Sequence, residues 1–132
     1  MTSTLVPGLL DTQIMLDCVR GHPPATSFFI RINWNIGARF SRLTATEILA
    51  RCQSDADRAL SLRFIGNSIV LDLTDVIVKR AVDLLTTIGL PTTLTASDAI
   101  IAATAIEHSL PLYTLDPTRF TAVPGITTLQ PY

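Results

Sequence analysis

The sequence is poor in the residue types that build common metal and disulfide sites. It contains two cysteines and two histidines in 132 residues. Cys18 and Cys52 fit no CxxC or CxxH spacing, and His22 and His108 are isolated. These spacings disfavour both a metal site built from cysteine and histidine and a Ser-His-Asp triad. We expect both cysteines to be reduced core residues of a cytoplasmic protein.

Long apolar runs and an excess of charge are also absent. The longest apolar run, residues 99–103, is far shorter than the roughly 20 residues of a membrane-spanning helix. No basic segment precedes an apolar one at the N-terminus, so no signal peptide is expected. The net charge of −1 indicates neither a strongly basic nucleic-acid-binding surface nor an acidic tail. We therefore expect a protein without a membrane span.

The apolar residues are mainly aliphatic and alternate between strand-like and helix-like segments. Apolar residues make up 48% of the chain and aromatic residues 6%, and the length suits one domain over residues 1–132. The alternation predicts an α/β fold with a mainly parallel sheet of four to five strands, covered by helices on both faces. The expected strands are residues 9–11, 39–43, 68–73, 112–115 and 126–129. The expected helices are residues 12–20, 24–33, 44–53, 54–64, 74–88 and 96–108.

Four acidic residues are expected on one rim of this sheet. Asp11 and Asp116 end strands, whereas Glu47 and Asp98 lie in the first turns of helices. Ligands of open parallel sheets bind beyond the carboxyl ends of the strands. Carboxylates gathered there repel one another and need protons or a cation. A hard divalent ion with oxygen ligands, Mg²⁺ or Mn²⁺, is the simplest solution.

A purely structural interpretation of the same acids is equally simple. Residues 44–47 (Thr-Ala-Thr-Glu) and 95–98 (Thr-Ala-Ser-Asp) both fit the capping box. An acid in a first helical turn also complements the helix dipole. Asp11 and Asp116, in contrast, follow strands where no capping need is evident. Caps and metal ligands therefore remain alternative explanations for Glu47 and Asp98.

The segments around these acids resemble the PIN domain. The matching segments are residues 10–12 (Leu-Asp-Thr), 43–49 (Leu-Thr-Ala-Thr-Glu-Ile-Leu), 97–105 (Ser-Asp-Ala-Ile-Ile-Ala-Ala-Thr-Ala) and 112–120 (Leu-Tyr-Thr-Leu-Asp-Pro-Thr-Arg-Phe). The tail, residues 123–132, looks like the end of toxin-type members of the VapC group. The resemblance implies a three-layer α/β/α sandwich and a ribonuclease site dependent on Mg²⁺ or Mn²⁺. It also implies an RNA substrate, a VapB-like antitoxin and a homodimer.

The resemblance assigns roles to individual residues. Asp11, Glu47 and Asp98 match the three best-kept acids of the family, and Asp116 matches a fourth, more variable one. All four would be catalytic and metal-binding. Behind them, Thr12 and Thr114 would orient ligands or water.

Arginine is the side chain best suited to forked phosphate contacts, and three arginines near the expected rim are candidates for binding RNA phosphate: Arg42, Arg51 and Arg119. Two positions depart from the family pattern. Gln13 stands where Asn or Ser is more usual, and Arg119 precedes Phe120 where many relatives have an acid. Without that acid, Asp116 would have to substitute as the fourth ligand.

Other functions remain to be weighed against a nuclease. A PIN-fold binding module with weak or no nuclease activity would act through partner contacts. The apolar faces formed by Ile14, Met15 and Cys18 and by Phe28, Phe29 and Ile32 suit either such contacts or the core. A phosphatase or receiver domain needs a second acid beside Asp11, and the segment that follows Asp11 lacks one. A nucleotide-binding enzyme is disfavoured because the chain has no glycine-rich phosphate loop.

Overall fold

A sheet of five parallel strands forms the centre of the computed structural model, which describes residues 5–132. The strand order is β3-β2-β1-β4-β5, and every neighbouring pair is parallel. The strands are β1 (Leu9–Leu10), β2 (Arg39–Ser41), β3 (Ile69–Leu71), β4 (Leu112–Tyr113) and β5 (Thr128–Leu129). The prediction of a parallel sheet of four to five strands is confirmed, with each strand shorter than expected.

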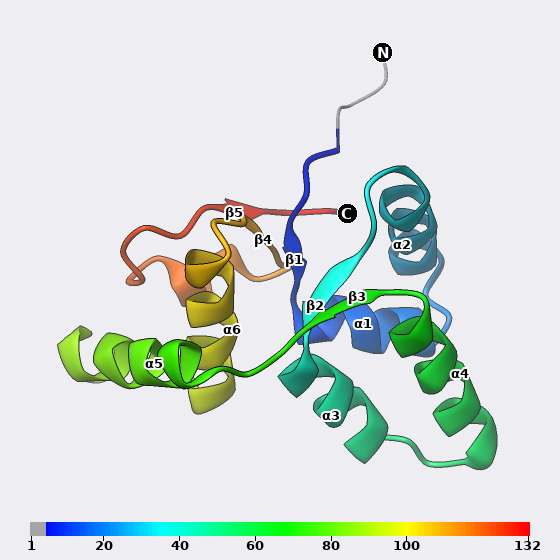
Figure 1. The fold of residues 1–132 in the computed structure, drawn as a ribbon, viewed down its shortest axis with the longest axis horizontal. Coiled ribbons are helices and arrows are strands. Elements are labelled where there is room, and N and C mark those ends of the chain that lie inside the picture. The colour runs from blue at the N-terminus through cyan, green and yellow to red at the C-terminus, as the bar shows by residue number, and fades with distance from the viewer. Residues whose placement is uncertain (1–4) are drawn as a thin grey trace.

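Helices cover both faces of this sheet. Figure 1 shows α5 and α6 on one side of the strands and α1 to α4 on the other. The helices of residues 5–132 are α1 (Thr12–Val19), α2 (Pro23–Asn35), α3 (Arg42–Ala50), α4 (Asp55–Gly66), α5 (Asp75–Thr87), α6 (Ala96–Glu107) and the short 3₁₀ helix η1 (Pro117–Phe120). None of them combines the length and hydrophobicity that a membrane-spanning helix requires. The predicted α/β/α sandwich is therefore confirmed.

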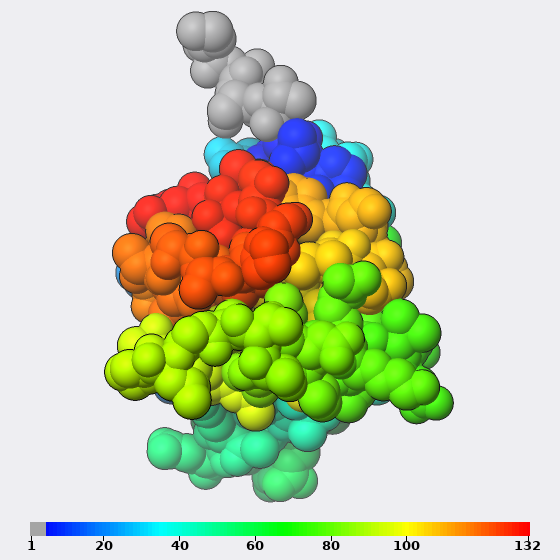
Figure 2. Space-filling view, turned by 90° about the vertical axis from the view of Figure 1, so that its left-hand side faces the viewer, coloured from blue at the N-terminus to red at the C-terminus, as the bar shows by residue number. Residues whose placement is uncertain are grey.

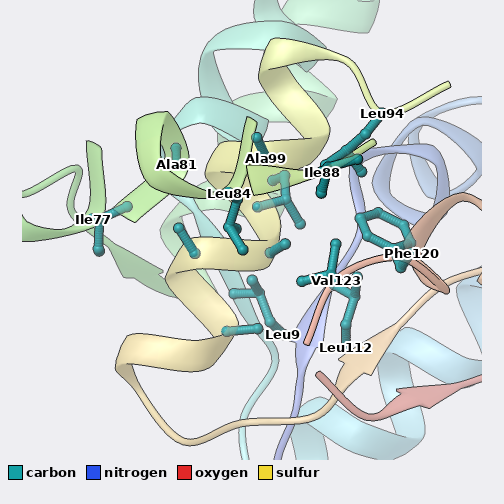
Figure 3. Close-up of a cluster of buried hydrophobic side chains, with 14 residues drawn as sticks. Leu9, Ile77, Ala81, Leu84, Ile88, Leu94, Ala99, Leu112, Phe120 and Val123 are labelled. Atoms are coloured by element: carbon teal, nitrogen blue, oxygen red, sulfur yellow. The ribbon is translucent and has the colours of Figure 1, made fainter. Parts of the chain in front are cut away.

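Successive residues of the central strands enter two different hydrophobic cores. Leu9 and Leu112 pack in a core with α5 and α6, whereas Leu10 and Tyr113 pack in a core with α1, α2 and α3. This division follows from the alternation of side chains along a strand. Figure 3 shows the first core, in which the Phe120 ring joins Leu9, Leu112 and side chains of α5 and α6.

Phe120 fixes η1 against the sheet. Its side chain is buried in the core formed with α5 and α6. Figure 2 shows α5 lying across this side of the molecule, with the C-terminal segment beside it. Because η1 follows β4 by only a few residues, the anchored Phe120 holds the neighbouring Arg119 near the carboxyl ends of β1 and β4.

The apolar faces formed by Ile14, Met15 and Cys18 and by Phe28, Phe29 and Ile32 belong to the core. Ile14, Met15, Phe28 and Ile32 are buried between α1, α2 and the sheet. Burial and the nearby Asp17 charge raise the pKa of the buried Cys18 thiol to about 12, so Cys18 stays uncharged at neutral pH. Core packing therefore accounts for the buried residues of these faces, whereas Ile30, between Phe29 and Ile32 in the sequence, is 66% exposed.

The two predicted capping boxes have different outcomes. At α6 the box is confirmed, because Thr95 Oγ1 accepts from the Asp98 N–H at 3.0 Å and Asp98 Oδ2 accepts from the Thr95 N–H at 3.1 Å. At residues 44–47 the prediction is wrong. The strand β2 ends at Ser41, whose hydroxyl caps α3 three residues before Thr44, the expected cap. Glu47 therefore lies in the second turn and has no capping role.

Gly8 sits immediately before β1 at a place with no room for a side chain. An added Cβ would lie 2.5 Å from the Tyr113 ring and 3.1 Å from the Pro111 carbonyl oxygen. The ring has little freedom to move, because the Tyr113 hydroxyl donates to the Val6 carbonyl at 2.7 Å. We expect Gly8→Ala to lower the free energy of unfolding by about 1–3 kcal/mol, measured by urea denaturation.

Gly66 provides the matched control for that substitution. A Cβ added at this last residue of α4 meets nothing within 4 Å. Gly66→Ala should therefore raise the free energy of unfolding by about 0.4–1 kcal/mol. Equal effects of the two substitutions would contradict the steric explanation.

Candidate active site

Asp11 lies at the carboxyl end of β1 and begins α1. Its carboxylate is buried, with 3% of the residue exposed. Oδ1 accepts from the Thr12 N–H at 2.8 Å, and Oδ2 accepts from the Thr114 hydroxyl at 2.8 Å. The expectation that Asp11 has no capping role is therefore wrong, because α1 follows β1 without a loop. Capping occupies Oδ1 and leaves Oδ2 on the inner side of the site.

Asp98 divides its oxygens in the same way. Oδ2 completes the capping box of α6, and Oδ1 accepts from Arg119 Nη1 at 3.0 Å. The residue is 5% exposed, and the next turn of α6 is anchored by the buried Ala99 and Ile101. The cap and a ligand role are thus compatible, because each uses a different oxygen.

Arg119 brings three of the predicted acids together. Its Nη2 lies 3.1 Å from Asp11 Oδ2, its Nη1 lies 3.0 Å from Asp98 Oδ1, and its Nε lies 3.3 Å from Asp116 Oδ2. Of the buried side-chain nitrogen and oxygen atoms in residues 5–132, this Nε alone has no hydrogen-bond partner, because its contact with Asp116 lacks the required alignment. Arg119, predicted to bind RNA phosphate, is thus paired with acids in this structure.

Glu47 faces the same site from α3. Its Oε1 accepts from the Thr12 hydroxyl at 3.1 Å, and that hydroxyl also lies 2.9 Å from Thr44 Oγ1. Glu47, Asp11 and Asp98 line one cavity of about 320 Å³. Thr44 was missed as a site residue because its position suggested a cap. Its spacing of three residues from Glu47 places both on one face of a helix, and this spacing was the available signal.

Of the remaining predicted residues, some lie at the cavity and others lie away from it. Arg51 lines the cavity. Arg42 does not line it and forms an exposed ion pair with Asp72 instead. Thr114 connects two acids, because its hydroxyl donates to Asp11 and accepts from the Asp116 N–H at 3.1 Å. Asp116 itself reaches the site only through Arg119 and Thr114.

The surroundings of the Asp11 carboxyl disfavour its charged form. Burial raises its pKa above the ordinary value, and the negative charge of Asp98 acts in the same direction. The Thr114 hydrogen bond, the Arg119 charge and the Thr12 N–H lower the same pKa but do not cancel the effect of burial. A buried acid of this kind is stabilised in its charged form by additional positive charge.

The donor chemistry of the site fits a hard divalent ion. Asp11, Asp98 and Asp116 already surround one positive charge, and Glu47 lines the cavity beside it. Carboxylate oxygens are the ligands that Mg²⁺ and Mn²⁺ prefer. Within residues 5–132, however, no three acidic, cysteine or histidine side chains stand in a ready-made metal-binding arrangement. The Arg119 guanidinium contacts three of these carboxylates.

Comparison with known proteins identifies the family. The family model of the PIN domain matches residues 8–126, so the chain belongs to the PIN domain family. The resemblance found in the sequence is confirmed. A comparison with curated proteins gave no match.

Solved structures of similar fold include several toxin–antitoxin complexes. A chain of a toxin-antitoxin complex from Klebsiella pneumoniae has a TM-score of 0.77 and 25% identity, over 96% of this chain and 98% of that chain. A chain of DNA-bound VapBC from Salmonella typhimurium has a TM-score of 0.77 and 20% identity, over 97% and 100%. A chain of FitAcB from Neisseria gonorrhoeae has a TM-score of 0.71 and 21% identity, over 95% and 98%.

Proposed function

We propose that this protein is a metal-dependent ribonuclease that acts as the toxin of a VapBC-type toxin–antitoxin pair. The observation that carries the proposal is the convergence of Asp11, Glu47 and Asp98 on one cavity at the carboxyl edge of the sheet. PIN domains are generally nucleases, and the similar structures come from toxin–antitoxin complexes. We place its action in the cytoplasm, where the free thiols of Cys18 and Cys52 would stay reduced.

In the proposed reaction, the four acids would together bind a metal ion and position an attacking water. A bound Mg²⁺ or Mn²⁺ would supply Lewis-acid polarisation of the scissile phosphate and a water of lowered pKa. Asp11 and Asp98 would hold the ion through their inner oxygens. Glu47 would bind directly or through water, or accept a proton from the attacking water. Asp116 would act through a water molecule.

Neighbouring hydroxyls and arginines would support these acids. The Thr12 hydroxyl fixes Glu47, and the Thr114 hydroxyl fixes Asp11, so both carboxylates are oriented before substrate binds. Arg51 on the cavity wall is the nearest candidate for a phosphate contact, and Arg42 would serve a more distant phosphate. We propose single-stranded or looped RNA as substrate, because sequence-specific reading of RNA mostly requires unstacked bases.

A VapB-like antitoxin would have an apolar surface to cover. A groove of about 410 Å³ between α2 and α4 is lined by Phe29, Ile30, Trp34 and Phe64. Trp34 is 87% exposed and Ile30 66% exposed, and exposed aromatic residues of this kind are typical anchors of protein interfaces. We propose that a segment of the antitoxin binds in this groove.

The outer face of α5 is the proposed homodimer contact. Val76, Val78 and Val82 are exposed on this helix, which lies across the front of Figure 2. These valines flank the exposed charged residues Lys79 and Asp83 on a helix whose other face is buried, and a second copy of the chain would cover them.

Cleavage of RNA by the purified protein tests the proposed function. A set of short single-stranded and hairpin RNAs should be cut in the presence of Mn²⁺ or Mg²⁺ and left intact with a chelator. Expression of the protein should also arrest growth, and co-expression of the protein encoded by the adjacent reading frame should relieve the arrest. A folded protein that cuts no RNA with either metal would overturn the nuclease proposal.

A further inference from the structure

We propose that Arg119 is an internal counter-ion of the candidate metal site and competes with the divalent ion. Its single positive charge would offset part of the negative charge of Asp11, Asp98 and Asp116 in the metal-free protein, and it would leave them when a metal ion binds. This inference rests on the proposed function insofar as that function places a metal ion at these acids. It adds a control of metal binding by a residue of the same chain.

The geometry shows one side chain holding three acids from separate elements. The Arg119 nitrogens lie 3.0, 3.1 and 3.3 Å from Asp98, Asp11 and Asp116. These acids come from the start of α6, the end of β1 and the segment after β4. Arginine is always charged and presents a rigid fork of donors. The resulting contact is a permanent positive charge at the centre of the acids.

The oxygens that a metal ion needs are the ones that Arg119 occupies. Asp11 Oδ1 and Asp98 Oδ2 are committed to helix caps, so the inner oxygens of the site are Asp11 Oδ2 and Asp98 Oδ1. Both accept from Arg119. A Mg²⁺ ion would have to approach these oxygens to about 2.1 Å. The guanidinium and the ion therefore exclude each other, by volume as well as by charge.

Arg119 has a route out of the site that leaves the fold unchanged. The neighbouring Phe120 is buried and holds η1 in place, whereas the Arg119 side chain is 31% exposed. Its Nε is buried without a hydrogen-bond partner, so departure would relieve one unsatisfied donor. Rotation of a long side chain toward solvent is sufficient to vacate the oxygens.

Two consequences follow from competition. The apparent affinity for the metal is the intrinsic affinity multiplied by the fraction of molecules in which Arg119 has left the acids, so it falls as Arg119 occupies them more fully. The metal-free protein is stabilised, because without Arg119 the buried carboxylates would repel one another. Removing Arg119 should therefore raise metal affinity and lower the thermal midpoint of the metal-free protein.

Binding of Mn²⁺ alone tests the proposal. The free ion is measured by electron paramagnetic resonance for the wild type, Arg119→Gln and the control Arg51→Gln. Arg51 lines the same cavity and has no ion-pair contact with an acid in the described residues. We expect Arg119→Gln to bind Mn²⁺ at least about tenfold more tightly than wild type, with a much smaller gain for Arg51→Gln. Unchanged or weaker binding by Arg119→Gln, or equal gains for both variants, would overturn the proposal.

A measurement on the wild-type protein covers the case in which Arg119→Gln fails to fold. The Nε–H resonance of Arg119, assigned through its side chain, is followed by nuclear magnetic resonance during titration with the diamagnetic ion Mg²⁺. Displacement predicts that this resonance shifts and that its hydrogen exchanges faster with water as Mg²⁺ saturates. A resonance that stays unchanged while Mg²⁺ binds would contradict displacement.

Neither measurement requires RNA cleavage, so the two proposals fail separately. Tighter Mn²⁺ binding by Arg119→Gln without cleavage by any variant would support the counter-ion and overturn the nuclease. Cleavage by the wild type with no gain in affinity on removal of Arg119 would do the reverse. If no variant binds Mn²⁺, the counter-ion proposal is wrong.

Discussion

Asp98→Asn should abolish metal-dependent RNA cleavage and leave the protein folded. The substitution removes the charge that would hold the metal ion through Oδ1, and metal stabilisation of the reacting phosphate is worth several kcal/mol. We therefore expect cleavage to fall by at least about 100-fold. The measurement is the rate of cleavage of one RNA fragment under saturating Mn²⁺, with the thermal midpoint recorded on the same preparation.

The fold should tolerate this change because asparagine retains the capping role. The asparagine carbonyl accepts the Thr95 N–H as Asp98 Oδ2 does at 3.1 Å, and Asn is a good residue near a helix N-terminus. The substitution also removes one buried carboxylate from beside Asp11, whose pKa the Asp98 charge helps to raise. Loss of the ion pair with Arg119 acts in the opposite direction. We expect the two effects to offset each other to within about 1 kcal/mol.

Thr95→Ala is the matched control, because it removes the capping hydroxyl and keeps the Asp98 carboxylate. The Thr95 hydroxyl accepts from the Asp98 N–H at 3.0 Å, and loss of such a cap costs about 0.5–2 kcal/mol of stability. Cleavage should fall by less than about tenfold, because Asp98 is still present and loses only one orienting contact. If both variants lost stability and activity together, Asp98 would be a structural cap and not a ligand.

The fold could be predicted from the sequence because the patterns that mark its strands and helices are local. The apolar segments before Asp11 and Asp116 are strand-like, and the helices α1, α2, α4 and α5 end at a glycine or two residues before one. Boundaries were less accurate where a local competitor acts. The second strand was expected to reach residue 43, but the Ser41 hydroxyl caps α3 and stops β2 there. At the first strand the competitor is Asp11, which was expected to end the strand but caps α1.

The candidate site was accessible only in part, because its contacts join distant residues. The placement of Asp11 and Glu47 on one cavity followed from the rule that parallel strands end at one edge. The rule did not fix Asp98, which lines the same cavity, because α6 follows another helix and not a strand. The role of Arg119 did not follow from any local pattern, since its contacts with Asp11 and Asp98 span 108 and 21 residues. The sequence marked Arg119 as a departure from the family pattern, but only the packing of η1 shows that it points at the acids.

Phe40→Ala should cause the largest loss of stability among single substitutions considered for this protein. Phe40 lies in the middle of β2, with no exposed surface, in the core formed with α1, α2 and α3. Truncation of a buried phenylalanine costs about 3–5 kcal/mol through lost burial and the cavity left behind. Total stabilities of domains this size are roughly 5–15 kcal/mol, so a large part of the stability would be lost. Urea denaturation followed by circular dichroism measures the change.

Trp34→Ala distinguishes loss of core packing from loss of aromatic surface in general. Trp34 is larger than Phe40 but 87% exposed on α2, so its truncation should change stability by no more than about 0.5 kcal/mol. Circular dichroism is required as the signal, because Trp34 is the only tryptophan in the chain. A comparable loss for both variants would mean that the groove beside α2 stabilises the isolated chain. The small effect expected instead leaves Trp34 free for binding, and its truncation should weaken capture of the antitoxin while the fold persists.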